Sequence, residues 1–323
     1  MRTGKISFLL LFFFLSLFAC SNKHHDPLSF RVLTLKGPSA ISMIRWIDEI
    51  RRMPDGTIDM EIMNEPSQVR NQILKHKADL AVVPMNMASI LYNRQTDYQL
   101  LAVPVWGTLY LFGSKNQITC WNDLKGKRVF VMARGMTPDI LFRYLLTRQG
   151  LQPGKDVALD YRFPTHIDLA NAAIAGKAPL AILSEPLVSL AVSRNPQLVP
   201  LIDLNQAWVN QNSTHQPMPQ TALLVRSQFA QEHAVILKKW ILALKQSAHW
   251  VNKHPEEAAA LIVQYGILPD TALARQAIPR CHISFQKASE VSESIYHYLR
   301  ILFEYDPRSI GGKIPDDHFI FAK

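Results

Sequence analysis

The sequence predicts an α/β protein built as two lobes, each with its own sheet and covering helices. Its 323 residues are 48% hydrophobic and 19% charged, which supplies enough apolar surface for two cores and excludes a disordered or fibrous chain. Short apolar runs alternate with amphipathic segments, as a largely parallel sheet joined by helices requires. The alternation occurs in two successive series followed by a long helical tail, so we expect two lobes.

The first series begins at residue 30. Its predicted strands cover 30–35, 58–63 and 78–83. A turn at 37–39 opens a helix whose isoleucines share one face, namely Ile41, Ile44, Ile47 and Ile50. A second helix begins at Pro66 and continues to 77, and a short third one covers 86–92. An extended stretch, 98–112, then leads to the second series.

The second series repeats the pattern of strand, turn and helix. Its predicted strands cover 128–132, 157–162 and 180–183. Its first helix has Thr137 as N-cap, Pro138 in the first turn and Gly150 just beyond its end. A second helix is predicted over 168–175.

The remainder of the chain is predicted to return to the first lobe. Residues 205–219 are polar, and a loop of this length is either functional or a connector. Trp208 within it is either a lid residue or a surface anchor. A strand at 221–226 brings the chain back, and residues 228–303 are predicted to be helical.

The N-terminus has the pattern of an export signal. Arg2 and Lys5 precede an apolar run, 6–19, that is shorter than the roughly 18 residues a membrane-spanning helix needs. The run ends in Leu-Phe-Ala-Cys, which resembles the lipobox of bacterial lipoproteins, so we expect cleavage before Cys20 and a lipid on its sulfur. The alternative is an ordinary secretory signal with a chance cysteine. We therefore predict a signal peptide at 1–19 and a polar tether at 20–28.

The charge of the chain limits the classes of partner. Removing Arg2 and Lys5 with the signal lowers the formal net charge from +9 to +7. No basic run exceeds two residues, so we expect no nucleic-acid binding. The positive excess fits a small anionic ligand or an anionic membrane surface better.

No enzyme motif is present in the sequence. It lacks Gly-x-Gly-x-x-Gly, a phosphate-binding Gly-x-x-x-x-Gly-Lys-Ser/Thr loop, Gly-x-Ser-x-Gly and His-Glu-x-x-His, and its histidines have no metal-ligand spacing. Cys120 and Cys281 remain after lipidation, and we expect them to be unpaired because an α/β body of this size needs no disulfide. We predict no enzymatic activity, no cofactor and no metal.

Several short motifs resemble those of one family of carriers. They are Asp-Leu-Lys-Gly-Lys-Arg-Val at 123–129, Gly-Leu-Gln-Pro-Gly-Lys-Asp-Val at 150–157, Glu185-Pro186 after a strand, and Ala-Asp-Leu-Ala at 78–81. In this order, over nearly all of 30–323, they resemble the solute-binding proteins of bacterial ABC importers of the nitrate/sulfonate/taurine type, which share their fold with thiamine-pyrimidine-binding proteins. Thiamine-pyrimidine synthases have the same fold but a Cys- and His-rich iron pattern that this chain lacks.

The resemblance implies a periplasmic-binding-protein type II fold with two crossing strands and a ligand cleft between the lobes. It implies lobe 1 from 29–108 and 222–323, and lobe 2 from 109–221. It further implies a monomeric carrier that closes on a solute and docks on an ABC permease. A surface lipoprotein that binds a protein partner remains the alternative of another class.

Two helix N-termini are candidate ligand contacts, because their free N–H groups and positive dipole ends favour an anion. The residues are Gly37, Pro38 and Ser39 in lobe 1 and Gly135, Met136 and Thr137 in lobe 2. Ordinary helix capping is an equally good explanation of Ser39 and Thr137.

Five further side chains are candidates. Asn86 follows a buried strand and either contacts the ligand or caps a helix. Trp106 and Tyr110 flank the crossing and either stack on a planar ring or pack in the core. Glu185 either binds an amine, pairs with a lysine of the other lobe or caps a helix, and Thr221 lies where the chain returns to lobe 1. An oxyanion such as a sulfonate, nitrate or taurine is slightly favoured over a thiamine-pyrimidine-like heterocycle.

Overall fold

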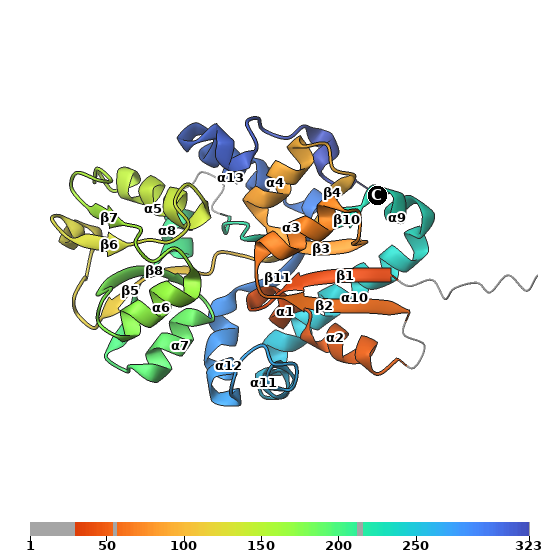
Figure 1. The fold of residues 1–323 in the computed structure, drawn as a ribbon, viewed down its shortest axis with the longest axis horizontal. Coiled ribbons are helices and arrows are strands. Elements are labelled where there is room, and N and C mark those ends of the chain that lie inside the picture. Colours follow the sequence, from red (N-terminus) through yellow and green to blue (C-terminus); the bar gives the residue numbers. More distant parts are fainter. Residues whose placement is uncertain (1–29, 54–56, 212–215, 323) are drawn as a thin grey trace, which may run out of the picture.

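The computed structural model describes residues 30–53, 57–211 and 216–322. The predicted signal peptide, the tether and Cys20 lie outside these ranges. The protein is an α/β structure with two sheets, drawn on the right and the left of Figure 1.

The first sheet has the strand order β11-β4-β10-β3-β1-β2. Its strands are β1 (Phe30–Leu35), β2 (Ile58–Met63), β3 (Leu80–Pro84), β4 (Tyr98–Val105), β10 (Thr221–Arg226) and β11 (Ile283–Lys287). β1 is parallel to β2 and β3, whereas β10 is antiparallel to β3 and β4, and β11 is antiparallel to β4. The sheet is therefore mixed, with a parallel half formed by the first three strands.

The second sheet has the order β7-β6-β8-β5-β9. Its strands are β5 (Leu109–Ser114), β6 (Arg128–Phe130), β7 (Ala158–Asp160), β8 (Leu180–Ser184) and β9 (Leu198–Asp203). β6 is parallel to β7 and β8, and β5 is antiparallel to β8 and β9. It repeats the mixed design of the first sheet.

Helices cover both faces of each sheet, because successive side chains of a strand point to opposite faces and both sets are apolar. In β1, Val32 belongs to the apolar cluster on one face of the sheet, and the next residue, Leu33, belongs to the apolar cluster on the other face. One face of the first sheet carries α1 (Pro38–Ser42), α2 (Ile44–Arg51), α9 (Ser227–Glu232), α10 (Ala234–Lys253), α11 (Pro255–Gln264) and α12 (Thr271–Ala277). The other carries α3 (Pro66–Leu74), α4 (Met85–Asn93) and α13 (Ser292–Tyr305).

The second sheet is covered in the same way. On one face lie α6 (His166–Ile174) and α7 (Leu187–Arg194), which form a separate apolar cluster with the sheet. On the other lie α5 (Thr137–Arg148) and α8 (Leu204–Gln211). Their side chains belong to the same cluster as those of α4 and α13, so one apolar cluster continues from one sheet to the other.

Two chain segments connect the sheets and lie side by side. One follows β4 and the other precedes β10, and Trp106 forms an antiparallel bridge with Pro219. Gly107 N donates to Met218 O at 2.9 Å, and Met218 N donates to Asn205 Oδ1 at 3.0 Å. A Cβ on Gly107 would lie 2.5 Å from Asn205 Oδ1, so only glycine permits this close approach.

Four local predictions were wrong. The N-cap of α5 is Met136, and Thr137 is already helical. Much of the predicted loop at 205–219 is α8, because Leu204, Ala207 and Trp208 have the spacing of a buried helix face; Trp208 is accordingly buried. The helix after Gly37 divides at Met43 into α1 and α2. The tail is not wholly helical, since β11 interrupts it and pairs with β4.

Candidate functional site

The candidate site starts from one edge of the first sheet, where β1 and β3 end and β10 begins. Thr221, the first residue of β10, pairs with Pro84, the last residue of β3. α4 begins immediately after Pro84, which places Asn86 in its first turn. After β1, Gly37 opens α1. Strand ends that meet at one edge are where α/β proteins bind ligands.

Three buried polar atoms at this edge have no hydrogen-bond partner within the described protein. They are Asn86 Oδ1, Gln220 Oε1 and Thr221 Oγ1. Asn86 is only 1% exposed and Thr221 8%. Buried polar groups are nearly always hydrogen-bonded, because leaving one unpaired costs about 1–3 kcal/mol. A ligand bound at this edge would supply the missing partners of these three atoms.

The nitrogen of Asn86 is fixed by other groups. Nδ2 donates to Ser309 O at 3.3 Å and lies 3.7 Å from Met136 Sδ, which it reaches as a donor. Exchanging the amide oxygen and nitrogen would lose the bond to the carbonyl of Ser309. The side chain therefore presents its oxygen, an acceptor, as its free group.

The turns of the second sheet meet this edge directly. The Asn86 contact joins α4 to Met136, the N-cap of α5. A Cβ on Gly37 would lie 3.4 Å from Pro186 Cδ, so the turn before α1 touches the turn before α7. The structure thus places Asn86 beside Met136 and Gly37 beside Pro186.

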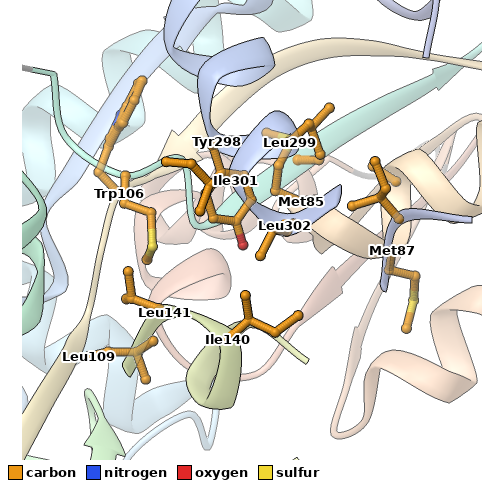
Figure 2. Close-up of a cluster of buried hydrophobic side chains, with 14 of the residues drawn as sticks. Met85, Met87, Trp106, Leu109, Ile140, Leu141, Tyr298, Leu299, Ile301 and Leu302 are labelled. Atoms are coloured by element: carbon orange, nitrogen blue, oxygen red, sulfur yellow. The ribbon is translucent and has the colours of Figure 1, made fainter. Parts of the chain in front are cut away.

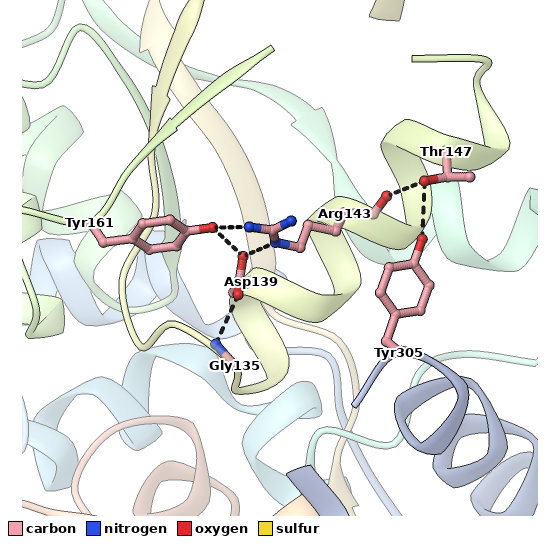
Figure 3. Close-up of polar contacts among 6 residues, drawn as sticks. All are labelled: Gly135, Asp139, Arg143, Thr147, Tyr161 and Tyr305. Atoms are coloured by element: carbon pink, nitrogen blue, oxygen red, sulfur yellow. Dashed lines mark hydrogen bonds and ion pairs between the residues drawn. The ribbon is translucent and has the colours of Figure 1, made fainter. Parts of the chain in front are cut away.

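The predicted anion site at the start of α5 is occupied by the protein's own carboxylate. Gly135 N donates to Asp139 Oδ2 at 2.8 Å, and Asp139 Oδ1 accepts from Arg143 Nε at 2.8 Å and from the Tyr161 hydroxyl at 2.7 Å (Figure 3). Asp139 is 3% exposed. The buried carboxylate of Asp139 already interacts with the positive end of the α5 dipole. This helix N-terminus is therefore not free to attract an external anion.

The Thr137 hydroxyl is also engaged, 2.7 Å from the hydroxyl of Tyr298 on α13. Burial raises the pKa of Tyr298 well above its usual range. Figure 2 shows the Tyr298 hydroxyl pointing towards α5, among Ile140, Leu141 and side chains of α4 and α13. The two sheets therefore meet through apolar side chains as well as through the polar edge.

At the start of the other helix, Pro38 is half-buried in the first turn of α1 and Ser39 is 3% exposed. The hydroxyl of Ser42 donates to Ser39 O at 2.7 Å. α1 has only five residues, so its dipole offers an anion less than the sequence led us to expect.

Both predicted aromatic residues are buried with their polar atoms paired. Trp106 Nε1 donates to Ser284 O at 2.8 Å, and the Tyr110 hydroxyl donates to Arg280 O at 3.4 Å. Burial raises the pKa of Tyr110 above its usual range, and nearby Asp203 and Glu185 act in the same direction. These bonds connect the segment that joins the two sheets to the segment after α12. Both side chains therefore have a packing role, and their rings contribute apolar surface.

Glu185 lies at the centre of a buried polar network and pairs with an arginine rather than the predicted lysine. Its carboxylate accepts from Arg280 Nε at 2.6 Å and from the backbone N and hydroxyl of Ser189 at 3.2 and 3.0 Å. Burial raises the pKa of the carboxyl, against the opposing effect of Arg280 and Ser189. The pair joins α7 of the second sheet to the tail that packs on the first.

Arg280, Tyr298, Ser309 and Asp139 were missed by sequence reasoning. Arg280, Tyr298 and Ser309 come from the C-terminal tail and lie 95 to 223 residues away in sequence from the residues that they contact. No short sequence motif can therefore predict them. Asp139 follows the predicted helix start by two residues, where an acidic side chain is a common capping signal.

Two pockets of the described residues lie away from the candidate site. They have volumes of about 210 and 640 Å³, are lined by residues such as Gln99, His318 and Tyr296, and contain none of the predicted site residues. Within residues 30–322 as described, no cluster of three or more His, Cys, Asp or Glu side chains could hold a metal ion. Cys120 is an exposed free thiol and Cys281 a buried one. No helix in the described ranges is both long and apolar enough to cross a membrane.

Solved structures share this fold. An ABC transporter protein from Parabacteroides distasonis is 30% identical, with a TM-score of 0.79 over 92% of this chain and 99% of that one. The periplasmic aliphatic sulphonate binding protein SsuA from Escherichia coli is 16% identical, with a TM-score of 0.74 over 92% and 93%. The periplasmic nitrate-binding protein NrtA from Synechocystis is 14% identical, with a TM-score of 0.56 over 74% and 66%.

These likenesses define the class: the protein has the periplasmic-binding-protein fold, as the sequence predicted. The family model described as NMT1/THI5 like matches residues 55–258, and the chain belongs to this family. The prediction that the chain is not an enzyme agrees with this family membership and with neighbours whose names describe binding proteins. No curated protein sequence matches the chain significantly.

Proposed function

We propose that the protein is the solute-binding component of an ABC importer and holds a small solute between its two sheets. The observation that carries this proposal is the group of unpartnered buried atoms Asn86 Oδ1, Gln220 Oε1 and Thr221 Oγ1. They lie at the strand edge that touches the turns of the second sheet. A solute enclosed there would complete their hydrogen bonds, which stabilises the closed arrangement of the sheets.

The two sheets correspond to two lobes in this proposal, with lobe 1 at 29–108 and 222–323 and lobe 2 at 109–221. Support comes from the strand membership of the sheets, which changes between β4 and β5 and again between β9 and β10. The paired segments at Trp106 and Pro219 are the natural hinge, because a few residues between rigid units absorb the rotation of a closure.

The geometry favours a solute that donates hydrogen bonds and has an apolar face. Asn86 Oδ1 and Gln220 Oε1 only accept, and the apolar cluster that continues from one sheet to the other includes Met85, Leu109 and Ile140. A planar heterocycle with an amino group, such as a thiamine-type pyrimidine, meets both conditions. Asp139 at the start of α5 disfavours an anion at that end.

An oxyanion solute is the second candidate, and one observation favours it. Lys36 is exposed at the end of β1, next to Gly37, and a sulfonate or nitrate would pair with its ammonium. The sulphonate- and nitrate-binding neighbours are below 25% identity, so their likeness supports the fold and not this choice.

The two candidates are separated by thermal melting of residues 21–323 with each solute class. A bound solute at about 100 times its Kd adds roughly 2.7 kcal/mol, which raises the melting temperature by a few degrees. We expect a shift with aminopyrimidines and none with taurine, alkanesulfonates or nitrate. The reverse pattern would support the oxyanion, and no shift with any member of the panel would contradict the carrier proposal.

We also propose that the protein is exported, anchored through lipid on Cys20 as a monomer, and docks on an ABC permease. The lipobox-like end of the apolar run supports the anchor. Labelling cells with radioactive palmitate should mark the wild-type protein and not a Cys20→Ala variant. Equal labelling of both, or of neither, would contradict the anchor.

A further inference from the structure

The helix α10 presents an exposed face that nothing in the described structure covers. Its other side is buried against the first sheet through Leu237, Trp240 and Leu244. On the exposed side, Val235 is 69% and Leu242 56% exposed, values that are high for large apolar residues. Residues 235, 238, 242 and 245 are three or four apart, so they share this side, which we call the α10 face.

Lysines surround the two apolar residues of the α10 face. Lys238, Lys239, Lys245 and Lys253 are all exposed, and α10 contains no Asp or Glu. Every ion pair found among the described residues is made by an arginine, so these lysines have no carboxylate partner there. The nearest acids in sequence are Glu232 before the helix and Glu256 and Glu257 after it, and Glu256 is paired with Arg275. The α10 face is therefore both basic and apolar.

The position of the chain's N-terminal end points to the partner. The ring of Phe30, the first described residue, lies 5.0 Å from that of His233 and 5.6 Å from that of Trp240, at the start of α10. Ten residues join Cys20 to Phe30 and span at most about 35 Å when extended. α10, with 20 residues, is about 30 Å long. The lipid proposed above would thus hold α10 within reach of the bilayer.

We propose that the α10 face lies on the anionic phospholipid surface of the membrane. The lysine ammonium groups pair with lipid phosphates, while Val235 and Leu242 enter the headgroup region. The proposal rests on the lipid attachment of the proposed function for its geometry, but the chemistry of the face does not require it.

The test is sedimentation of unlipidated residues 21–323 with vesicles, so that failure of lipidation at Cys20 cannot affect the result. We expect binding to vesicles with about 30% anionic phosphatidylglycerol, little binding to pure phosphatidylcholine, and loss of binding in about 1 M salt. The variant Lys238→Glu/Lys245→Glu should bind the anionic vesicles at least about tenfold more weakly. The matched control is Lys125→Glu/Lys155→Glu, which makes the same charge change at exposed positions beside the second sheet and should keep near-normal binding.

Two results would overturn the proposal. One is equal binding of the wild-type protein to anionic and neutral vesicles, or to neither. The other is an equal loss of vesicle binding in the two double variants, which would show a general effect of net charge. An acidic protein partner would then explain the α10 face better than a membrane does. Both double variants should melt like the wild-type protein and keep the same solute-induced shift, so the result is independent of the solute-binding proposal.

Discussion

The Asn86 side chain is fixed by the hydrogen bond from its amide nitrogen to Ser309 O, and its amide oxygen has no partner within the described protein. The neighbouring Thr221 hydroxyl is buried without a partner, and both lie where β3 meets β10. The sequence could predict that Asn86 follows a strand end, because the apolar run before it is unambiguous. It could not predict that the oxygen is the free group, since that depends on Ser309, 223 residues away.

Replacing Thr221 by valine tests whether its hydroxyl serves the solute. Removing an unpartnered buried hydroxyl should leave the unfolding free energy unchanged or raise it by up to about 1 kcal/mol, while solute affinity falls about tenfold. The control is Thr96→Val, because the Thr96 hydroxyl donates to Leu91 O at 3.0 Å. It should lose about 1 kcal/mol of stability and no affinity. Denaturant unfolding and calorimetric titration measure both quantities, and the opposite pattern would contradict the assignment.

Arg280→Met should leave the Glu185 carboxylate buried without its cation. The Glu185 side chain is fully buried and that of Arg280 is 32% exposed, so we expect a loss of about 2–4 kcal/mol at pH 7. Loss of Arg280 raises the carboxyl pKa further, which favours the neutral form in the folded state. Stability relative to the wild-type protein should therefore be best below the raised folded pKa of wild-type Glu185 and fall as the pH rises towards the higher folded pKa of the variant.

Denaturant unfolding at several pH values measures this effect. The double variant Glu185→Met/Arg280→Met removes both charges and should recover most of the loss, because a buried pair exchanged for apolar side chains is often neutral. A loss that is independent of pH, or no recovery in the double variant, would show that the network contributes through packing alone.

Among the elements, β1, β2 and β10 were predicted with their observed boundaries, because in each of them apolar residues occur at alternate positions or in a short run. β9 and β11 were not predicted. β11 is a five-residue strand with only alternate residues buried, set between helices, and its pairing with β4 is over 170 residues away in sequence. α8 was hidden by its polar composition, although Leu204 and Trp208 have helical spacing.

The loop that anchors Asn86 depends on a close approach at Gly311. Gly311 and Gly312 both have positive φ, so alanine at either position costs about 1–2 kcal/mol. Only at Gly311 would the new methyl group lie 3.1 Å from Ile90 Cα and Asn93 Cβ on α4, whereas Gly312 faces open space. Gly311→Ala should therefore lower stability by about 1 kcal/mol more than Gly312→Ala. Equal effects of the two substitutions on denaturant unfolding would contradict this packing.

The contact between α5 and α13 can be tested by a double-mutant cycle. Tyr298→Phe leaves the Thr137 hydroxyl, on a residue 6% exposed, without its partner and should cost about 1–2 kcal/mol. Adding Thr137→Val should restore part of that loss. Tyr305→Phe is the control, because its bond to Thr147 at 3.0 Å is exposed and should be worth no more than about 0.5 kcal/mol. Additive effects in the Tyr298 cycle would show that the two hydroxyls act independently.

At the scale of the whole molecule, the fold class was predictable because two series of strands and helices can be recognised in the sequence. The order of strands in each sheet was not, since the antiparallel pairing of β10 and β5 depends on how the chain crosses between sheets. The candidate site was predicted in part for the same reason. Gly37 and Asn86 follow strand ends in sequence, whereas Arg280 and Tyr298 enter from a tail whose docking only the complete fold determines.

The central claim is that a solute is held between the two sheets by Asn86. Calorimetric titration of the wild-type protein, Asn86→Leu and Asn93→Leu with an aminopyrimidine tests it most directly. Asn93 is the matched amide on α4, and its Nδ2 donates to Ile310 O at 2.8 Å in the same loop. We expect affinity to fall at least about tenfold in Asn86→Leu and to remain near the wild-type value in Asn93→Leu, provided both are folded at the titration temperature. Wild-type affinity in Asn86→Leu, or an equal fall in both variants, would contradict the account.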